Sequence, residues 1–187
     1  MRTASQPAVS RTISAFVSAS SGVRARFLVF AALAASVDLL TKAVATSFLS
    51  NGDMVSISEK VAFLLVYNTG GSGGLMIGPY TWALNVIVTL AAIAMVTHIV
   101  TPLSAVDPRA TVSLGLVTGG AFGNLASMLT GPAGVADFLA VDVSDDLTIV
   151  MNVADLLLWT GAALLIPVVV RLVLAVRAER AAARVRG

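Results

Sequence analysis

Four long apolar blocks dominate the sequence, and they limit the chain to folds that remove these blocks from water. The blocks extend from about Phe27 to Phe48, Tyr80 to Val100, Thr111 to Leu129 and Leu147 to Val176. A helix rises about 1.5 Å per residue, so about 20 apolar residues cross the hydrocarbon core of a bilayer, which is about 30 Å thick. The chain is 57% hydrophobic and 12% charged, whereas soluble domains average about 45–50% and about 25%. The sequence therefore predicts an all-α membrane protein with four transmembrane helices.

The segments outside these blocks differ in composition. Residues 1–24 are rich in Ser, Ala and Thr and contain no acid, which is typical of a disordered tail. Residues 49–79 contain a turn signal followed by a stretch rich in Val, Ile and Phe with partial alternation, which predicts a small extracytoplasmic β-sheet on the membrane surface. Residues 177–187 form a basic tail. We therefore expect one four-helix membrane domain over residues 25–176, between two cytoplasmic tails.

The positions of the basic residues predict the orientation. With four spans, both termini and a loop at residues 101–110 lie on one side of the membrane. Ten of the 12 Lys and Arg residues belong to that side: Arg2, Arg11, Arg24, Arg26, Arg109, Arg171, Arg177, Arg180, Arg184 and Arg186. By the positive-inside rule both termini are cytoplasmic. The ends of the spans that carry Lys42, Asn124 and Asp155 then lie toward the outer face, together with Asn68 and Asp137.

Two carboxylates, Asp137 and Asp155, are next to sequence that is apolar enough to cross a bilayer. Ionisable groups are costly to keep at such places, so they indicate function. Asp38 and Lys42 lie four residues apart in the first span, a spacing that lets them pair on one helix face. Two carboxylates that lie close together share one proton, which is what aspartic proteolysis requires. A pathway for protons or ions through Asp38, Lys42, Asp137 and Asp155 explains the bare pattern equally well.

Other chemistries are disfavoured. The chain has no cysteine and one histidine, which leaves little for a metal site, and we expect no metal and no cofactor. The basic residues lack interleaved aromatics, so we expect no nucleic-acid partner. Residues 70–74 match a G-x-S-x-G pattern. The only histidine, His98, lies 18 residues beyond Tyr80, or roughly 27 Å along a helix, which is too far to activate Ser72.

Five short motifs occur in order along the chain. They are Asp38-x-x-Thr41-Lys42, Asn68-x-Gly70, Gly119-Gly120-x-x-Gly123-Asn124, Val135-Ala136-Asp137-Phe138 and Asn152-Val153-Ala154-Asp155. From about residue 25 to 170 this order resembles the lipoprotein signal peptidase family, the bacterial signal peptidases II. The resemblance implies a four-helix membrane peptidase with a small sheet and a catalytic dyad at Asp137 and Asp155. It also implies supporting or substrate-binding positions, which are Asp38, Lys42, Asn68, Gly70, Asn124 and Asn152.

The same resemblance implies a substrate and a location. The substrate is a prolipoprotein that carries diacylglycerol on its lipobox cysteine and is cut just before that cysteine. The protein is expected to be a monomer among the lipids of the bacterial inner membrane, with its active site toward the extracytoplasmic face.

The chain departs from the family's pattern at three places. The family usually has Asp-Arg where this chain has Ser127 and Met128, and Ala-Ala-Phe where it has Gly71-Ser72-Gly73. The turn before Asp137 is one residue longer. Two alternatives to a conventional peptidase therefore stay open: a divergent paralogue that binds lipoproteins with altered specificity or little cleavage, and the proton or ion pathway.

Overall fold

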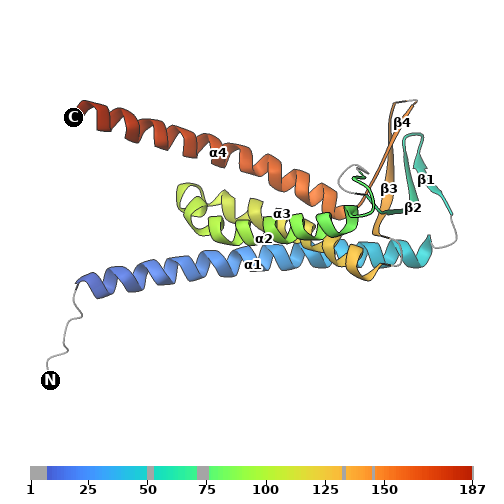
Figure 1. Ribbon diagram of the computed structural model, residues 1–187, viewed down its shortest axis with the longest axis horizontal. Coiled ribbons are helices and arrows are strands. Elements are labelled where there is room, and N and C mark those ends of the chain that lie inside the picture. Colours follow the sequence, from blue (N-terminus) through green and yellow to red (C-terminus); the bar gives the residue numbers. More distant parts are fainter. Residues whose placement is uncertain (1–7, 50–52, 71–75, 132–133, 145, 187) are drawn as a thin grey trace, which may run out of the picture.

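The computed structural model describes residues 8–49, 53–70, 76–131, 134–144 and 146–186, with side chains between residues 20 and 185. Its helices are α1 (Ala8–Phe48), α2 (Thr81–Val106), α3 (Arg109–Thr130) and α4 (Val153–Arg186). Each contains a stretch long and apolar enough to cross a membrane, which confirms the four predicted spans. Figure 1 shows these helices as a bundle, with a small sheet at the end away from the C-terminus.

Helix α3 is the central element of the bundle. In the apolar stretch of α3, 56% is buried inside the molecule, compared with 28% for α1 and 11% each for α2 and α4. Small residues allow this central position. A Cβ at Gly119 would collide with the backbone of Ala31 in α1, and one at Gly120 would lie 2.8 Å from the carbonyl oxygen of Ala154 in α4. Close backbone approach through glycine is how membrane helices gain packing contacts without a hydrophobic driving force.

The sheet contains four antiparallel strands in the order β1-β2-β3-β4. Strands β1 (Val55–Ser58) and β2 (Val61–Asn68) come from the segment in which the sequence predicts strands. Strands β3 (Val135–Ser144) and β4 (Leu147–Met151) were not predicted. Because Leu147–Met151 pair with β3, the fourth helix begins at Val153 and not near Leu147. Phe138 of β3 packs with Ala45 and Leu49, so the sheet rests on the C-terminal end of α1.

Three other boundaries differ from the sequence prediction. Helix α2 continues through Pro102 to Val106, so the expected loop at 101–110 is reduced to Asp107 and Pro108. Helix α1 extends back to Ala8, although residues 1–24 were expected to be disordered. No proline or glycine lies between Ala8 and Ser21. The one glycine before the span, Gly22, lies inside the helix, where an isolated glycine is tolerated at a cost of about 1 kcal/mol. Helix α4 similarly extends through the expected tail to Arg186.

An ion cluster closes the end of the bundle opposite the sheet. Asp107, which is 1% exposed, accepts hydrogen bonds from Arg109 and lies 3.1 Å from Nη1 of Arg171 in α4. The hydrogen bonds from Arg109 lower the pKa of the Asp107 carboxyl to about 2. The Asp107–Arg171 contact therefore links the short connection between α2 and α3 to α4. It holds the three helices together at the end of the bundle away from the sheet.

Candidate active site

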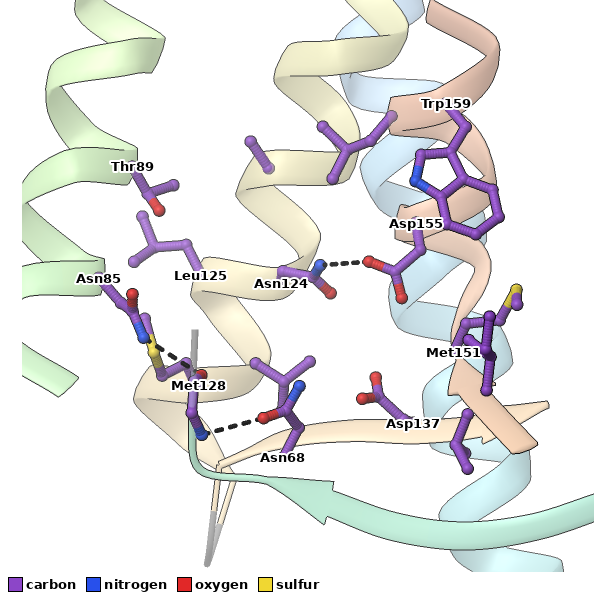
Figure 2. Close-up of a pocket in the computed structure, with 16 residues that line it drawn as sticks. Asn68, Asn85, Thr89, Asn124, Leu125, Met128, Asp137, Met151, Asp155 and Trp159 are labelled. Atoms are coloured by element: carbon purple, nitrogen blue, oxygen red, sulfur yellow. Dashed lines mark hydrogen bonds between the residues drawn. The ribbon is translucent and has the colours of Figure 1, made fainter. Parts of the chain in front are cut away.

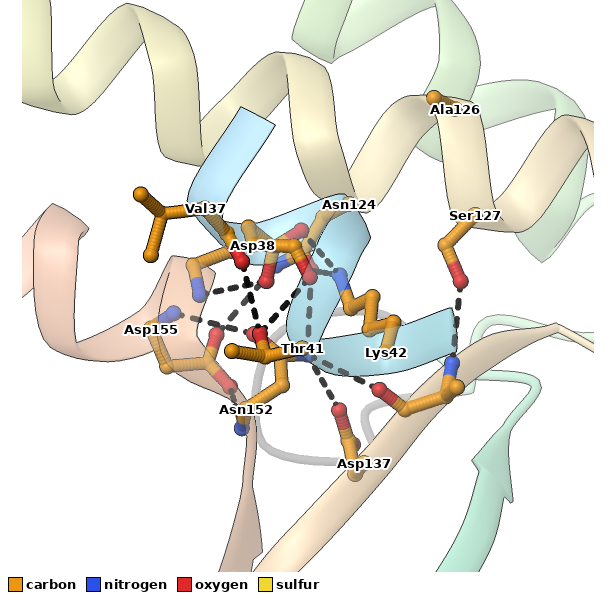
Figure 3. Close-up of polar contacts among 12 residues, drawn as sticks. Val37, Asp38, Thr41, Lys42, Asn124, Ala126, Ser127, Asp137, Asn152 and Asp155 are labelled. Atoms are coloured by element: carbon orange, nitrogen blue, oxygen red, sulfur yellow. Dashed lines mark hydrogen bonds and ion pairs between the residues drawn. The ribbon is translucent and has the colours of Figure 1, made fainter. Parts of the chain in front are cut away.

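Polar side chains from four elements meet where the sheet joins the helix ends. Asp38 and Lys42 lie in α1, Asn124 in α3, Asp137 in β3, and Asp155 in the first turn of α4. Figure 3 shows these side chains turned toward one another. Asp38 and Asp155 are 117 positions apart in the chain, so only the fold brings them together.

The N-terminus of α4 is closed by a reciprocal cap. Oδ1 of Asn152 accepts the backbone N–H of Asp155 at 3.1 Å, and Oδ2 of Asp155 accepts the backbone N–H of Asn152 at 3.0 Å. The backbone N–H of Ala154 donates to Oδ1 of Asp38 at 2.8 Å. Such a capping box satisfies helix N–H groups that have no partner within the helix. Asp155 is therefore held in a fixed position, at a helix end that favours negative charge.

Lys42 joins α1 to α3. Its Nζ lies 2.7 Å from Oδ2 of Asp38 and 2.6 Å from Oδ1 of Asn124. The side chains of Lys42 and Asp38 are 5% and 0% exposed. A buried ion pair is tolerated only when further hydrogen bonds satisfy its remaining donors and acceptors. Asn124 and the Ala154 N–H supply these bonds, so the pair predicted from the i,i+4 spacing also supports the groups around it.

Two asparagines connect this pair to the carboxylates. Nδ2 of Asn124 donates to Oδ1 of Asp155 at 3.3 Å. Nδ2 of Asn152 lies 2.5 Å from Oδ1 of Asp137 and 3.1 Å from Oδ1 of Asn124. Asn152, which is 1% exposed, therefore contacts both Asp137 and Asp155 and sets their relative placement.

Asp137 is 5% exposed. Burial raises the pKa of its carboxyl to about 6, and the negative charge of Asp155 adds to the rise. Hydrogen bonds from Asn152 and Asn68 and the charge of Lys42 act in the opposite direction. Asp137 can therefore hold a proton at a pH where an ordinary aspartate is ionised.

Asp137 and Asp155 line one cavity of about 330 Å³. Figure 2 shows both carboxylates on its wall, with Asn124 beside Asp155 and Asn68 near Asp137. Gly70 also lines the cavity, and its N–H donates to Oδ1 of Asn68 at 2.9 Å. The sequence-predicted positions that line the cavity are Asn68, Gly70, Asn124, Asp137 and Asp155. The other three, Asp38, Lys42 and Asn152, lie behind this wall and support it.

The two residues that depart from the family's pattern have different surroundings. Met128 lines the cavity. Ser127 is buried, and its Oγ accepts the backbone N–H of Ala136 at 3.1 Å, so it connects α3 to the start of β3. The departure at Gly71-Ser72-Gly73 lies outside the described residues, as do Pro132 and Ala133 of the longer turn before Asp137.

Sequence reasoning missed the contribution of α2 to the cavity. Asn85 and Thr89 line it, and Nδ2 of Asn85 donates to the carbonyl oxygen of Gly70 at 3.2 Å. An amide side chain in an otherwise apolar span is the signal that could have identified Asn85. Trp159 of α4 also lines the cavity. Within the described ranges, no three His, Cys, Asp or Glu side chains are grouped so that they could hold a metal ion.

Known proteins share this fold. Two solved structures of bacterial membrane enzymes superpose with TM-scores of 0.68 and 0.65, at 20% and 21% sequence identity. The first alignment covers 78% of this chain and 87% of the other. These likenesses establish the fold.

Relatives in sequence are closer. The lipoprotein signal peptidase of Bifidobacterium longum is 34% identical over 148 residues, which cover 77% of this chain and 79% of that protein. The lipoprotein signal peptidase of Mycobacterium tuberculosis is 35% identical over 137 residues, or 70% of this chain and 64% of that protein. The family description "Signal peptidase (SPase) II" matches residues 30–171. The chain therefore belongs to the signal peptidase II family.

Proposed function

We propose that this protein is an aspartic endopeptidase that removes signal peptides from diacylglyceryl-modified prolipoproteins. Membership of the signal peptidase II family supports an aspartic protease that acts on lipoprotein precursors. The observation that carries the mechanism is the placement of Asp137 and Asp155 on the wall of one cavity, both held by Asn152.

The surroundings of the two carboxylates support different roles. Asp155 lies at the N-terminus of α4 and accepts two hydrogen bonds, from the Asn152 N–H and from Asn124. These contacts hold the Asp155 carboxylate in place beside the cavity, where it takes a proton from the attacking water. Asp137 has its pKa raised by burial, so it carries the shared proton. It donates a hydrogen bond to the scissile carbonyl and then protonates the leaving amine.

The remaining residues support the dyad or contact the substrate. Asn124, Asn152, Asp38 and Lys42 hold the carboxylates, while Asn68 and Gly70 form the rim where the peptide enters. Both termini are cytoplasmic and the cavity opens toward the extracytoplasmic face of the inner membrane. The four-helix unit at residues 25–176 acts as a monomer.

The experiment is cleavage of a lipidated lipobox reporter by purified protein. Asp137→Asn and Asp155→Asn should each lower the rate about 10²–10⁴-fold. The double variant should lose little more, because the two groups act as a unit. Asp142→Asn is the matched control: it is the same change on the same strand, at an exposed aspartate whose Oδ1 contacts Thr148. It should cleave like the parent.

Several results would change the assignment. Near-normal cleavage by Asp137→Asn would exclude the dyad. If the parent binds the reporter without cleaving it, the protein is a paralogue that binds lipoproteins. This alternative is specific because Ser127 and Met128 replace the charged Asp-Arg pair that is usual in the family. Proton flux in liposomes that contain the parent protein would favour the ion pathway.

A further inference from the structure

Helix α2 presents two polar side chains to the cavity and mostly apolar ones elsewhere. Asn85 and Thr89 are half-buried and line the cavity, one helical turn apart. Their neighbours Leu84, Ile87 and Val88 are exposed on the outside of the bundle. Polar groups in a membrane helix are costly unless they face a cavity or a partner. Figure 2 shows Asn85 and Thr89 across the cavity from Asp155.

Each of these side chains has hydrogen-bonding capacity left over. Nδ2 of Asn85 donates to Gly70, but among the described residues its Oδ1 has no partner. The Thr89 hydroxyl makes no hydrogen bond within that part of the chain either. Thr97, two turns further along the same helix, instead donates to the carbonyl oxygen of Ala94 at 2.7 Å. Within the described ranges, Thr89 thus faces the cavity with an unused donor and Asn85 faces it with an unused acceptor.

A peptide that is to be cut must expose its scissile carbonyl, so it cannot remain helical at that point. Its N–H and C=O groups then need new partners, because an unpaired backbone group at the edge of a bilayer is costly. On the dyad side these partners are Asn124, Asp137 and Asp155. On the α2 side, the residues that line the cavity are Asn85 and Thr89, and both are polar.

The spacing of these two residues fits an extended peptide. Four residues along α2 correspond to a rise of about 6 Å. In an extended chain the backbone groups on one side repeat every two residues, or about 6.6 Å. A strand that runs along α2 can therefore place two residues that face the same side next to Asn85 and Thr89, one offering its N–H to Asn85 and the other its carbonyl to Thr89.

We propose that Asn85 and Thr89 bind the backbone of the substrate's signal-peptide segment, on the wall opposite the catalytic carboxylates. Asn85 accepts a peptide N–H and Thr89 donates to a peptide carbonyl. This assignment rests on the proposed peptidase function and adds to it a second wall that recognises the unwound backbone and not its side chains.

The test measures binding apart from cleavage. In an Asp155→Asn background, binding of a dansyl-labelled, lipidated lipobox peptide is followed by energy transfer from the protein's tryptophans, since Trp159 lines the cavity. A second set of peptides replaces one backbone N–H at a time with an ester oxygen in the signal-peptide segment. The added variants are Asn85→Ala, Thr89→Val and Thr89→Ser, with Thr97→Val as the matched control.

One ester position should weaken binding to the Asp155→Asn protein about fivefold to tenfold, the loss expected for one hydrogen bond. The same ester should cost less than about twofold when Asn85→Ala is added, because its partner is already gone. Thr89→Val should weaken binding of the all-amide peptide by a similar factor, Thr89→Ser should restore it, and Thr97→Val should have no effect.

Two results would overturn the proposal. One is a set of esters that cost the same with and without Asn85→Ala. The other is a Thr89→Val protein that binds as tightly as Thr97→Val. Thr89→Val keeps the shape of the side chain on a membrane helix, so a folded variant is expected and gel filtration checks it. Failure of the parent to cleave the all-amide peptide would instead count against the proposed function, and the binding arm would still decide this inference.

Discussion

The raised pKa of Asp137 makes a quantitative prediction about stability. A rise from the ordinary value of 3.8 to about 6 corresponds to about 3 kcal/mol, at about 1.36 kcal/mol for each pH unit. Below pH 3.8 the carboxyl is protonated in both the folded and the unfolded chain, so no penalty exists. Above pH 6 the folded protein must hold a buried, ionised carboxylate, so its stability falls as the pH rises through this window.

Asp137→Asn removes this penalty without removing the oxygen that accepts from Asn152. The free energy of unfolding of the variant minus that of the parent should therefore increase with pH. About 2 kcal/mol of the increase should develop between about pH 4.5 and 7.5. Any constant effect of the amide, favourable or not, cancels because only the change with pH is compared.

The assay is equilibrium unfolding of both proteins in mixed micelles at several pH values. Titrating groups that do not interact with Asp137 behave alike in both proteins, so their contributions also cancel. A difference that is independent of pH, or that decreases as the pH rises, would refute the reasoning. In that case Asp137 would not be the proton-holding member of the dyad.

Three further predictions concern packing, specificity and topology. Gly123→Ala should destabilise the fold by about 1–3 kcal/mol, because a Cβ at Gly123 would collide with the Asp38 carboxylate; Gly22→Ala, with no atom within 4 Å of the added Cβ, should leave thermal stability unchanged or slightly raised, because alanine favours a helix more than glycine does, and equal effects would contradict this. Ser127→Asp combined with Met128→Arg should speed cleavage of a standard lipidated substrate, whereas Met128→Arg alone adds a cation to the cavity without its adjacent aspartate partner; a parent already as fast as the double variant would show that the missing pair is irrelevant. Reporter fusions after Gly187 and at Pro108 should report the cytoplasm and those at Gly52 and Asp142 the outside, and a cytoplasmic signal at Asp142 would reverse the proposed orientation.

The helices could be predicted from the sequence because their signal is long. Runs of about 20 apolar residues have few alternatives to a membrane span. Strand β4 could not be recognised in the same way. Leu147–Met151 is a short apolar run directly before an apolar helix, and periodicity alone cannot separate the two. The pattern Asn152-x-x-Asp155 is a capping-box signal, and it would have placed the helix start at Val153.

The candidate site was accessible to sequence reasoning in part. The i,i+4 pair of Asp38 and Lys42 is a local pattern, and the ion pair it predicts forms at 2.7 Å. The contacts of Asn152 with Asp137 and of Asp38 with Ala154 depend on how the sheet meets the helix ends, and no local spacing contains that information. Asn85 was missed because a single amide in an apolar run gives no periodic signal.

The contacts that build α4 are also the contacts that place Asp155. Its carboxylate accepts the Asn152 N–H as part of the helix cap, and its second oxygen receives the Asn124 amide. Loss of activity after removal of the Asp155 side chain would therefore not show whether the residue acts as the catalytic base or only caps α4. Asp155→Asn makes that distinction, because the amide oxygen can still accept the cap hydrogen bond while the group can no longer take a proton. An Asp155→Asn protein that is folded and inactive locates the loss in proton transfer, whereas an unfolded one locates it in the cap.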